Sequence, residues 1–429
     1  MENEAHITPT IIPRPEHTLS RADISENALK VLYRLKQHGY QAYLVGGGVR
    51  DLLLGREPKD FDVATDARPE QVREVFRNCR LIGRRFRLAH VHFGREIIEV
   101  ATFRGPAQVD DEDRRVENGM ILRDNVYGTL EEDALRRDFT VNALYYNIAD
   151  FSVVDYVGGM DDLRAGLLRL LGDPEQRYRE DPVRMLRAVR FASKLGFNIE
   201  PSCERPLFEM GELLQVVPSA RLFDEVLKLF MAGTALIAFE KLRHYGLFGH
   251  LFPATEAALA REEEAFPITF VNRGLYNTDV RIEEGKPVTP AFLFAVLLWE
   301  PVRLRARELE AEGIPPFPAM QQAGSEVVIA QQPVVAQPKR FSLPMREIWN
   351  LQHRFTQRGG KRPHRLLTHP RFRAAYDFML LRAEAGEVEQ ELAEWWTAFE
   401  AEHAGDREKA VPARRRRRPR RRPRQKKPS

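Results

Sequence analysis

The chain has 429 residues, 43% of them hydrophobic and 30% charged, with a formal net charge of +4. This length exceeds what one hydrophobic core supports, so we expect about two to three domains. No apolar run approaches the roughly 20 residues that a membrane-spanning helix requires, which excludes a helical transmembrane protein. The opening residues, MENEAHITPTIIPRPEH, have neither the basic n-region nor the apolar h-region of a secretory signal.

The two cysteines, Cys79 and Cys203, lie far apart and outside any CxxC or Cys/His pattern. This spacing argues against a disulfide framework and against a zinc site. We therefore expect a protein of the reducing cytoplasm.

Sequence patterns predict elements of both kinds in the first third of the chain. Residues 1–22 are polar and contain prolines, which predicts a flexible lead-in. Apolar residues at helical spacing predict a helix at residues 24–38, and alternating or apolar segments predict strands within residues 41–47 and 61–65. A helix opened by Pro69, a strand at residues 79–83, a hairpin over residues 87–104 and a strand from residue 153 follow.

Helical patterns dominate from about residue 160 to residue 400. Prolines and polar residues between 315 and 340 interrupt them and predict a connector or surface loop. Between Arg414 and Lys427, eleven of fourteen residues are Lys or Arg, so the rest of the chain is net acidic. Such a block cannot bury apolar surface, and we predict a disordered tail that contacts the phosphate backbone of a nucleic acid. The alternative is a solvated tail without a partner.

The segment KDFDVAT places two aspartates around one phenylalanine. Strand residues alternate between the two faces of a sheet, so Asp60 and Asp62 are expected to point the same way. Two neighbouring carboxylates need a cation between them, and Mg²⁺ suits carboxylate oxygens together with waters and substrate phosphates. The alternative is a solvated strand edge.

Three glycines precede the aspartates in VGGGVRDLLLG. Gly46 and Gly47 would let backbone N–H groups approach a phosphate at the start of a helix, and Arg50 could bind the same phosphates. An ordinary turn after a strand is the alternative. Neither GxxxxGK[ST] nor GxGxxG occurs here, so a P-loop and a dinucleotide fold are both disfavoured. The fixed spacing of glycines, arginine and aspartates indicates nucleotide chemistry.

GGGVRDLLLG with KDFDVAT resembles the head motif of the class II nucleotidyltransferases, which belong to the DNA polymerase β superfamily. This family comprises tRNA CCA-adding enzymes and bacterial poly(A) polymerases. Three further motifs follow in the family's order: RRDFTVNALYY at Arg136–Tyr146, DYVGGMDDL at Asp155–Leu163 and EDPVRMLRAVRFASKLGF at Glu180–Phe197. The resemblance covers about residues 20–250.

The resemblance implies an α+β protein. Its N-terminal head is a polymerase β-like mixed sheet, and an elongated all-α body and the disordered basic tail follow. The expected divisions are a lead-in at 1–22, a catalytic head at 23–158, a nucleotide-selecting and RNA-binding neck at 159–255, a helical RNA-binding region at 256–405 and the tail at 406–429.

Site residues follow by matching motifs. The resemblance implies that Asp60 and Asp62 hold Mg²⁺ and that Gly46, Gly47 and Arg50 meet the phosphates. Arg137 is expected at the incoming nucleotide, beside Asp138 as the third active-site carboxylate. Glu99 is the rival for that role, because the superfamily commonly places a third acid on a later strand. Arg184 and Arg187 share one face of a helix and are expected to face the nucleotide and select its base; a salt-bridged helix surface is the alternative.

The expected activity is template-independent addition of AMP from ATP to RNA 3′ ends, with Mg²⁺ as cofactor. LIGRRFRLAHVHFG at Leu81–Gly94, the C-terminal helices and the tail favour a poly(A) polymerase. RGGKRPHRLLTHPRFRAAYDF, at Arg358–Phe378, interleaves basic and aromatic residues as an RNA surface or a packed core would. Partners from the RNA-degradation machinery are implied by the resemblance alone.

Two other functions stay open. A tRNA CCA-adding enzyme would use CTP as well as ATP and stop after three nucleotides. A non-catalytic RNA-binding protein on the same fold is a more distant alternative.

Overall fold

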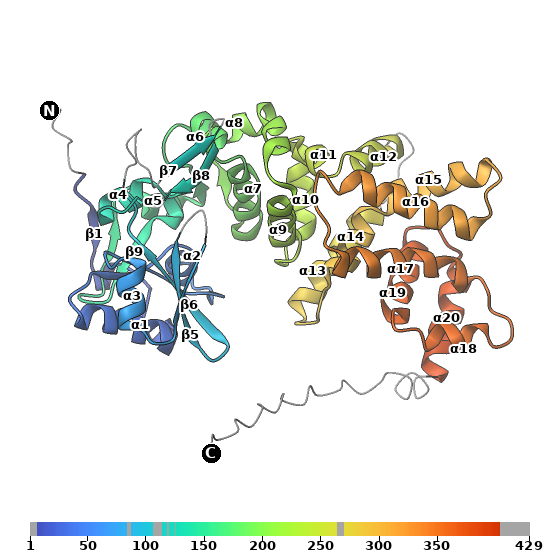
Figure 1. Ribbon diagram of the computed structural model, residues 1–429, viewed down its shortest axis with the longest axis horizontal. Coiled ribbons are helices and arrows are strands. Elements are labelled where there is room, and N and C mark those ends of the chain that lie inside the picture. The colour runs from blue at the N-terminus through green and yellow to red at the C-terminus, as the bar shows by residue number, and fades with distance from the viewer. Residues whose placement is uncertain are drawn as a thin grey trace, which may run out of the picture. The chain divides into compact units, whose positions relative to one another are not determined.

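The computed structural model describes residues 7–83, 87–105, 114–117, 120–124, 126–263 and 270–403. The chain divides into two compact units, Met1–Leu251 and Phe252–Ser429, which run from blue to green and from yellow to red in Figure 1. Within the described ranges, every helix is too short or too polar to cross a bilayer. The predicted basic tail and residues 84–86 of the LIGRRFRLAHVHFG stretch lie outside these ranges.

An eight-stranded sheet forms the head of the first unit, in the order β1-β10-β9-β2-β3-β6-β5-β4. Only β3 and β6 run parallel; the other neighbours are antiparallel, so the mixed sheet expected for the head is confirmed. The strands are β1 Thr10–Ile12, β2 Ala42–Val45, β3 Asp62–Thr65, β4 Cys79–Ile82, β5 Leu88–Phe93, β6 Glu96–Thr102, β9 Leu144–Asn147 and β10 Val153–Asp155. Smaller pairs are β7 Arg114–Glu117 with β8 Met120–Asp124, and β11 Leu167–Leu168 with β12 Asn198–Ile199.

The first helix shows how local sequence sets these elements. α1 Glu26–Gln37 begins where the Ser25 side chain accepts a hydrogen bond from the Ala28 amide, and it ends before Gly39, which has a φ of 86°. Its apolar stripe, which includes Leu32 and Leu35, is fully buried. α1 packs on β2, β3 and β6, and α3 Pro69–Val75 packs on β4, β5 and β6 (Figure 1). The predicted helices and strands therefore belong to one structure, in which α1 and α3 pack on the head sheet.

The N-terminal segment departs from the expected flexible lead-in. β1 pairs with β10 at the edge of the head sheet, and Ile12 and Leu19 are buried. The His17 ring also hydrogen-bonds the carbonyl of Phe151 at 2.9 Å. Apolar residues spaced among prolines give a weak strand signal. The strand forms because it pairs with β10, which lies far away in the sequence.

Two of the remaining helices of the first unit lie within the head, and the others follow it between residues 159 and 251. They are α2 Gly47–Leu53, α4 Leu130–Leu135, α5 Gly159–Ala165, α6 Pro174–Glu180, α7 Val183–Leu195, α8 Pro201–Glu209, α9 Ser219–Phe230, α10 Ala235–His244 and α11 Leu247–Leu251. α5 occupies the DYVGGMDDL motif, where Asp155 accepts hydrogen bonds from the amides of Val157, Gly159 and Met160. That motif is a strand end followed by a capped helix.

The second unit is entirely helical in its described part, which confirms the all-α body. Its helices are α12 Pro253–Glu263, α13 Phe270–Glu283, α14 Pro290–Leu297, α15 Trp299–Ala311, α16 Pro316–Gln331, α17 Lys339–Phe355, α18 Arg362–Leu367, α19 Phe372–Glu384 and α20 Gln390–Glu402.

The connector expected at residues 315–340 is wrong, because α16 fills most of it. Its prolines fall in the first turn, where the missing N–H groups would have had no helical partner. Ala319 and Ala323 are fully buried, and a Cβ built on Gly324 would lie 3.1 Å from the Trp349 ring. Small residues therefore let α16 approach α17 closely.

The aromatic residues of Arg358–Phe378 belong to the core. Phe372 and Tyr376 are 1% and 2% exposed, their rings stack at 5.6 Å, and Phe378 is fully buried. The packing alternative is therefore correct for these rings.

Candidate active site

The central strands of the head sheet bring two carboxylates together. Asp62, the first residue of β3, is paired with Glu99 of the parallel strand β6. Paired residues on neighbouring strands point to the same face, so both side chains share one face of the sheet. His90 on β5 lies opposite Glu99, and its Nε2 is 3.2 Å from Glu99 Oε2. The other neighbour of Asp62 is Val45, the last residue of β2.

Asp60 lies outside the strand, so strand alternation does not fix its direction relative to Asp62. It is an exposed loop residue two positions before β3. Its carbonyl would lie 3.4 Å from a Cβ built on Gly48, so the loop packs directly on the glycine turn. The charge of Asp60 still reaches Asp62, whose pKa it raises.

The electrostatics of Asp62 show a local excess of negative charge. Burial raises its pKa first, and the neighbouring carboxylate of Glu99 raises it further; together they bring it to about 6 against the attraction of Arg137. A carboxylate held in this way is stabilised by a cation. Among the described residues, no three His, Cys, Asp or Glu side chains form a metal site alone. The donor set fits Mg²⁺, which completes its shell with waters and substrate phosphates.

The glycine turn adjoins this face at the end of β2. Gly46 has a φ of 75° and a ψ of −138°, a conformation that only glycine adopts readily. A Cβ on Gly46 would also lie 3.6 Å from Nη1 of Arg137. The guanidinium of Arg137 therefore sits against the backbone of the turn, as the sequence motifs predict for a group that meets the nucleotide.

Arg137 is held in place by two neighbours that sequence reasoning missed. Its Nη2 donates to Asp133 Oδ2 at 2.9 Å and its Nε donates to the Tyr145 hydroxyl at 2.8 Å, which in turn donates to Asp133 at 2.6 Å. Burial would lower the pKa of Arg137, but Tyr145 and Asp133 raise it, so the residue stays charged. The position of Asp133, four residues before Arg137 and so at helical spacing, could have predicted this ion pair from the sequence.

Arg50 is buried against the glycine turn, since a Cβ built on Gly47 would lie 3.5 Å from its Nη2. It is 2% exposed, its Nε donates to Asp51 Oδ1 at 2.9 Å, and its Nη1 donates to Asn142 at 2.6 Å. Its guanidinium also lies 5.1 Å from the Phe191 ring centroid. Arg50 thus ties α2 to the 3-10 turn at Thr140–Asn142 and to α7. Its expected role as a phosphate ligand stays a prediction.

Asp138 is engaged by donors on all sides. Its oxygens accept from Arg187 Nε at 2.7 Å and from Arg187 Nη2, from the Phe139 amide at 2.9 Å and from Asn142 at 3.3 Å. Burial would raise its pKa, but Arg187 and the other donors lower it to about 2. This carboxylate is already neutralised by protein groups, whereas Glu99 adjoins Asp62. The geometry therefore disfavours Asp138 and favours Glu99 as the third acid beside Asp62.

The two arginines expected to select the base lie on α7 and have different partners. Arg184, with a side chain 12% exposed, donates to the carbonyl of Arg177 at 2.7 Å and to Glu180 at 3.2 Å. Arg187, with a side chain 31% exposed, binds Asp138 and lies 5.2 Å from the Phe191 ring. Arg184 thus joins α7 to α6, and Arg187 joins α7 to the head.

Comparisons with known proteins match nearly the whole chain. Family models match for the Poly A polymerase head domain at residues 42–169, the probable RNA and SrmB-binding site of polymerase A at 196–259 and the polymerase A arginine-rich C-terminus at 312–428. Poly(A) polymerase I of Salmonella typhi and of Escherichia coli O157:H7 are each 52% identical, over 96% of this chain and 92% of the relative. The chain belongs to the poly(A) polymerase I family.

In sequence, CCA-adding enzymes match a smaller part of the chain. That of Bacillus licheniformis is 38% identical over 53% of this chain and 56% of its own. The crystal structure of the Bacillus stearothermophilus CCA-adding enzyme in complex with CTP has a TM-score of 0.56 at 27% identity, over 87% of this chain and 82% of the other. The superfamily resemblance seen in the motifs is therefore confirmed. The poly(A) polymerase I relatives differ from the CCA-adding enzymes in that their sequence match covers nearly the whole chain.

Proposed function

We propose that the chain is a template-independent polynucleotide adenylyltransferase that transfers AMP from ATP to RNA 3′ ends. The observation that carries this proposal is the pairing of Asp62 with Glu99 on adjacent strands, beside a glycine turn that Arg137 contacts. The 52% identity to Poly(A) polymerase I over nearly the whole chain supports the choice of reaction.

In this reaction the 3′ oxygen of RNA bonds to the α-phosphorus of ATP, the bond to pyrophosphate breaks, and the hydroxyl proton passes to solvent. Asp60, Asp62 and Glu99 would hold Mg²⁺, which when bound lowers the pKa of the attacking hydroxyl and balances phosphate charge. Asp62 and Glu99 start from strands of one sheet, so their backbones do not need to reorganise. No nucleophilic side chain is required.

Arg137 and the glycine turn would bind the triphosphate. The salt bridge and hydrogen bonds to Asp133 and Tyr145 fix the guanidinium, so little side-chain entropy is lost when a phosphate binds. Gly46 and Gly47 leave the backbone open to close approach. Arg187, braced by Asp138, and Arg184 remain our candidates for positioning the base from α7.

RNA is the proposed polymeric substrate, and the basic tail is proposed to contact its backbone. The match to a probable RNA-binding segment at residues 196–259 supports an RNA partner. A CCA-adding activity is the second candidate, because about half of this chain is 38% identical to such an enzyme. In sequence, the CCA-adding relatives match only that half of the chain, whereas a poly(A) polymerase model also matches residues 312–428.

The test is AMP incorporation into an RNA primer with ATP and Mg²⁺, comparing the wild type with Asp62→Asn. Loss of this metal-binding carboxylate should lower the rate by about 10²-fold or more, with little change in RNA affinity. Asp161→Asn is the matched control, because that side chain is 85% exposed and pairs only with Arg164. Near-normal extension by Asp62→Asn would overturn the proposed site.

A further inference from the structure

A cavity of about 620 Å³ lies within the second compact unit, in a part of the chain that contributes nothing to the site above. Four helices surround it in a closed ring: α13 packs on α14, α14 on α17, α17 on α19, and α19 on α13. Its volume falls within the range of about 300–1,000 Å³ that is typical of small-molecule sites. We call it the ring cavity.

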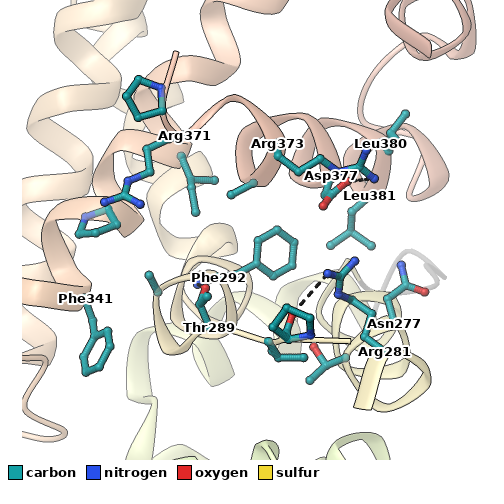
Figure 2. A pocket seen from close by; sticks show the side chains of 18 of the residues that line it. Asn277, Arg281, Thr289, Phe292, Phe341, Arg371, Arg373, Asp377, Leu380 and Leu381 are labelled. Carbon is teal, nitrogen blue, oxygen red and sulfur yellow. Dashed lines mark hydrogen bonds and ion pairs between the residues drawn. The ribbon is translucent and has the colours of Figure 1, made fainter. Parts of the chain in front are cut away.

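Two aromatic rings from different helices line the ring cavity. Phe292 of α14 and Phe341 of α17 are both half-buried, so part of each ring is open to an occupant. Phe292 also packs edge-on against Phe378 behind it, with ring centroids 6.1 Å apart, which fixes its orientation. Figure 2 shows Phe292 in the middle of the cavity and Phe341 at one end. A flat, apolar ligand group would have ready contact surfaces.

The rim of the ring cavity is cationic. It contains four arginines, of which Arg371 pairs with Glu347, and Arg373 pairs with Asp377 and Glu400. The other two, Arg281 and Arg340, form no ion pair with a carboxylate among the described residues, although the charge of Arg281 reaches Asp377 and opposes the rise in its pKa that burial causes. Arg281 Nη2 donates only to the Pro287 carbonyl at 3.3 Å, and Arg340 lies 4.7 Å from the centroid of the Phe341 ring.

These two arginines, which are not in ion pairs, lie at opposite ends of the ring cavity. Figure 2 places Arg281 at the end away from Phe341, with Phe292 between them, and Arg340 is at the Phe341 end because it contacts that ring. An anionic group on each side of a flat apolar group is the pattern of a nucleotide inside a polynucleotide chain. A free triphosphate, whose charges lie on one side of its base, would need its cations clustered at one end.

We propose that the ring cavity binds one nucleotide of single-stranded RNA, with its base against Phe292 and its flanking phosphates at Arg281 and Arg340. Aromatic stacking combined with arginines along the backbone is the usual mode of single-strand binding. This inference rests on the proposed function, in which RNA is the substrate. It adds a site for the RNA chain in a unit separate from the catalytic carboxylates.

The test measures the affinity of the full-length protein for a 12-nucleotide oligoadenylate at several salt concentrations, by fluorescence anisotropy. Arg281→Gln/Arg340→Gln should make the log–log salt slope shallower by about 1.4, because each single-strand phosphate contact contributes about 0.7. Phe292→Leu should weaken binding about fivefold or more at fixed salt. A control variant, Arg307→Gln/Lys30→Gln, removes two exposed cations outside the cavity and should leave the slope unchanged.

Steady-state extension then separates RNA from free ATP as the occupant. The apparent KM for RNA should rise in the cavity variants, whereas the KM for ATP should not. A urea titration checks that the arginine variant, whose changes are at the rim, is folded. If that variant keeps the RNA affinity and the salt slope of the wild type, the inference is wrong. A rise confined to the KM for ATP would also overturn it. A wild type that adds no AMP, while the cavity variants still bind RNA more weakly, would overturn the proposed function alone.

Discussion

Asp62 combines a functional position with an unfavourable electrostatic environment. Its pKa in the folded protein is about 6, above its ordinary value of 3.8, because of burial and the neighbouring Glu99. The folded state therefore takes up a proton as the pH falls through about 6, whereas the unfolded chain does so near 4. In metal-free protein, the cost of ionised Asp62 is present above pH 6 and disappears as the pH falls toward 4.

We predict from this that Asp62→Asn stabilises the metal-free protein at pH 7. Two pKa units correspond to at most about 3 kcal/mol in the free energy of unfolding, and this gain should vanish near pH 4. Urea unfolding in EDTA at several pH values measures it, with Asp161→Asn as the control. A variant less stable than the wild type at pH 7 would show that Asp62 is stabilised by groups other than a metal.

Glu99 and Asp138 should respond differently to neutralisation. Glu99→Gln should lower the rate of AMP addition and the affinity for Mg²⁺ with little effect on stability, because the Glu99 side chain is 41% exposed. Asp138→Asn should instead lower the free energy of unfolding by about 2 kcal/mol, since Arg187 loses its charged hydrogen-bond acceptor. Magnesium titrations of activity and urea unfolding separate the two. The reverse pattern would restore Asp138 as the third catalytic carboxylate.

At the residue scale, the roles predicted for the glycine turn, Asp62 and Arg137 stay predictions, but the structure groups these residues, each of which belongs to a local motif. Sequence reasoning ranked Glu99 second, because the parallel pairing that sets Glu99 beside Asp62 joins strands 37 positions apart. The structural partners of Arg50 were missed for a similar reason. Its spacing suits a phosphate ligand, but Asn142, 92 residues away, binds it inside the core.

At the scale of elements, periodicity predicted the helices and strands whose apolar stripes are regular, such as α1 and the β5–β6 hairpin. Prolines caused the error at α16, since composition cannot tell a proline that breaks a helix from one in its first turn. The EDPVRMLR motif also spans the boundary between two helices, α6 and α7. Asp181 ends α6, Pro182 caps α7, and Arg184 bridges the two helices.

This junction carries a prediction about base choice. If α7 positions the base, Arg184→Ala should reduce the preference for ATP over CTP about tenfold and raise the KM for ATP, because two hydrogen bonds that orient the helix are lost. Competition between the two nucleotides in one reaction measures the preference. Arg164→Ala removes an exposed arginine of α5 and should change nothing. Unchanged discrimination with reduced stability would make Arg184 a purely structural brace.

At the scale of the whole molecule, sequence patterns predicted a mixed helix–strand region followed by helices, and the family resemblance implied the mixed-sheet head. The structure divides the chain after Leu251. The finer domain limits and the RNA contacts of the tail stay predictions. Only part of the ring cavity had a sequence signal: Arg371 and Arg373 at its rim fall in the Arg358–Phe378 stretch. The rest of its lining comes from four helices and the loops before α14 and α19, between residues 277 and 384, and only packing brings these side chains together.

The central claim is template-independent addition of AMP, and product length from a single nucleotide tests it most directly. A generic RNA with a free 3′ hydroxyl is incubated with Mg²⁺ and either ATP alone or CTP alone, and the products are resolved on a sequencing gel. We predict long, heterogeneous extension with ATP and little with CTP. Addition of no more than a few nucleotides, dependent on CTP and confined to tRNA ends, would contradict the claim and identify a CCA-adding enzyme.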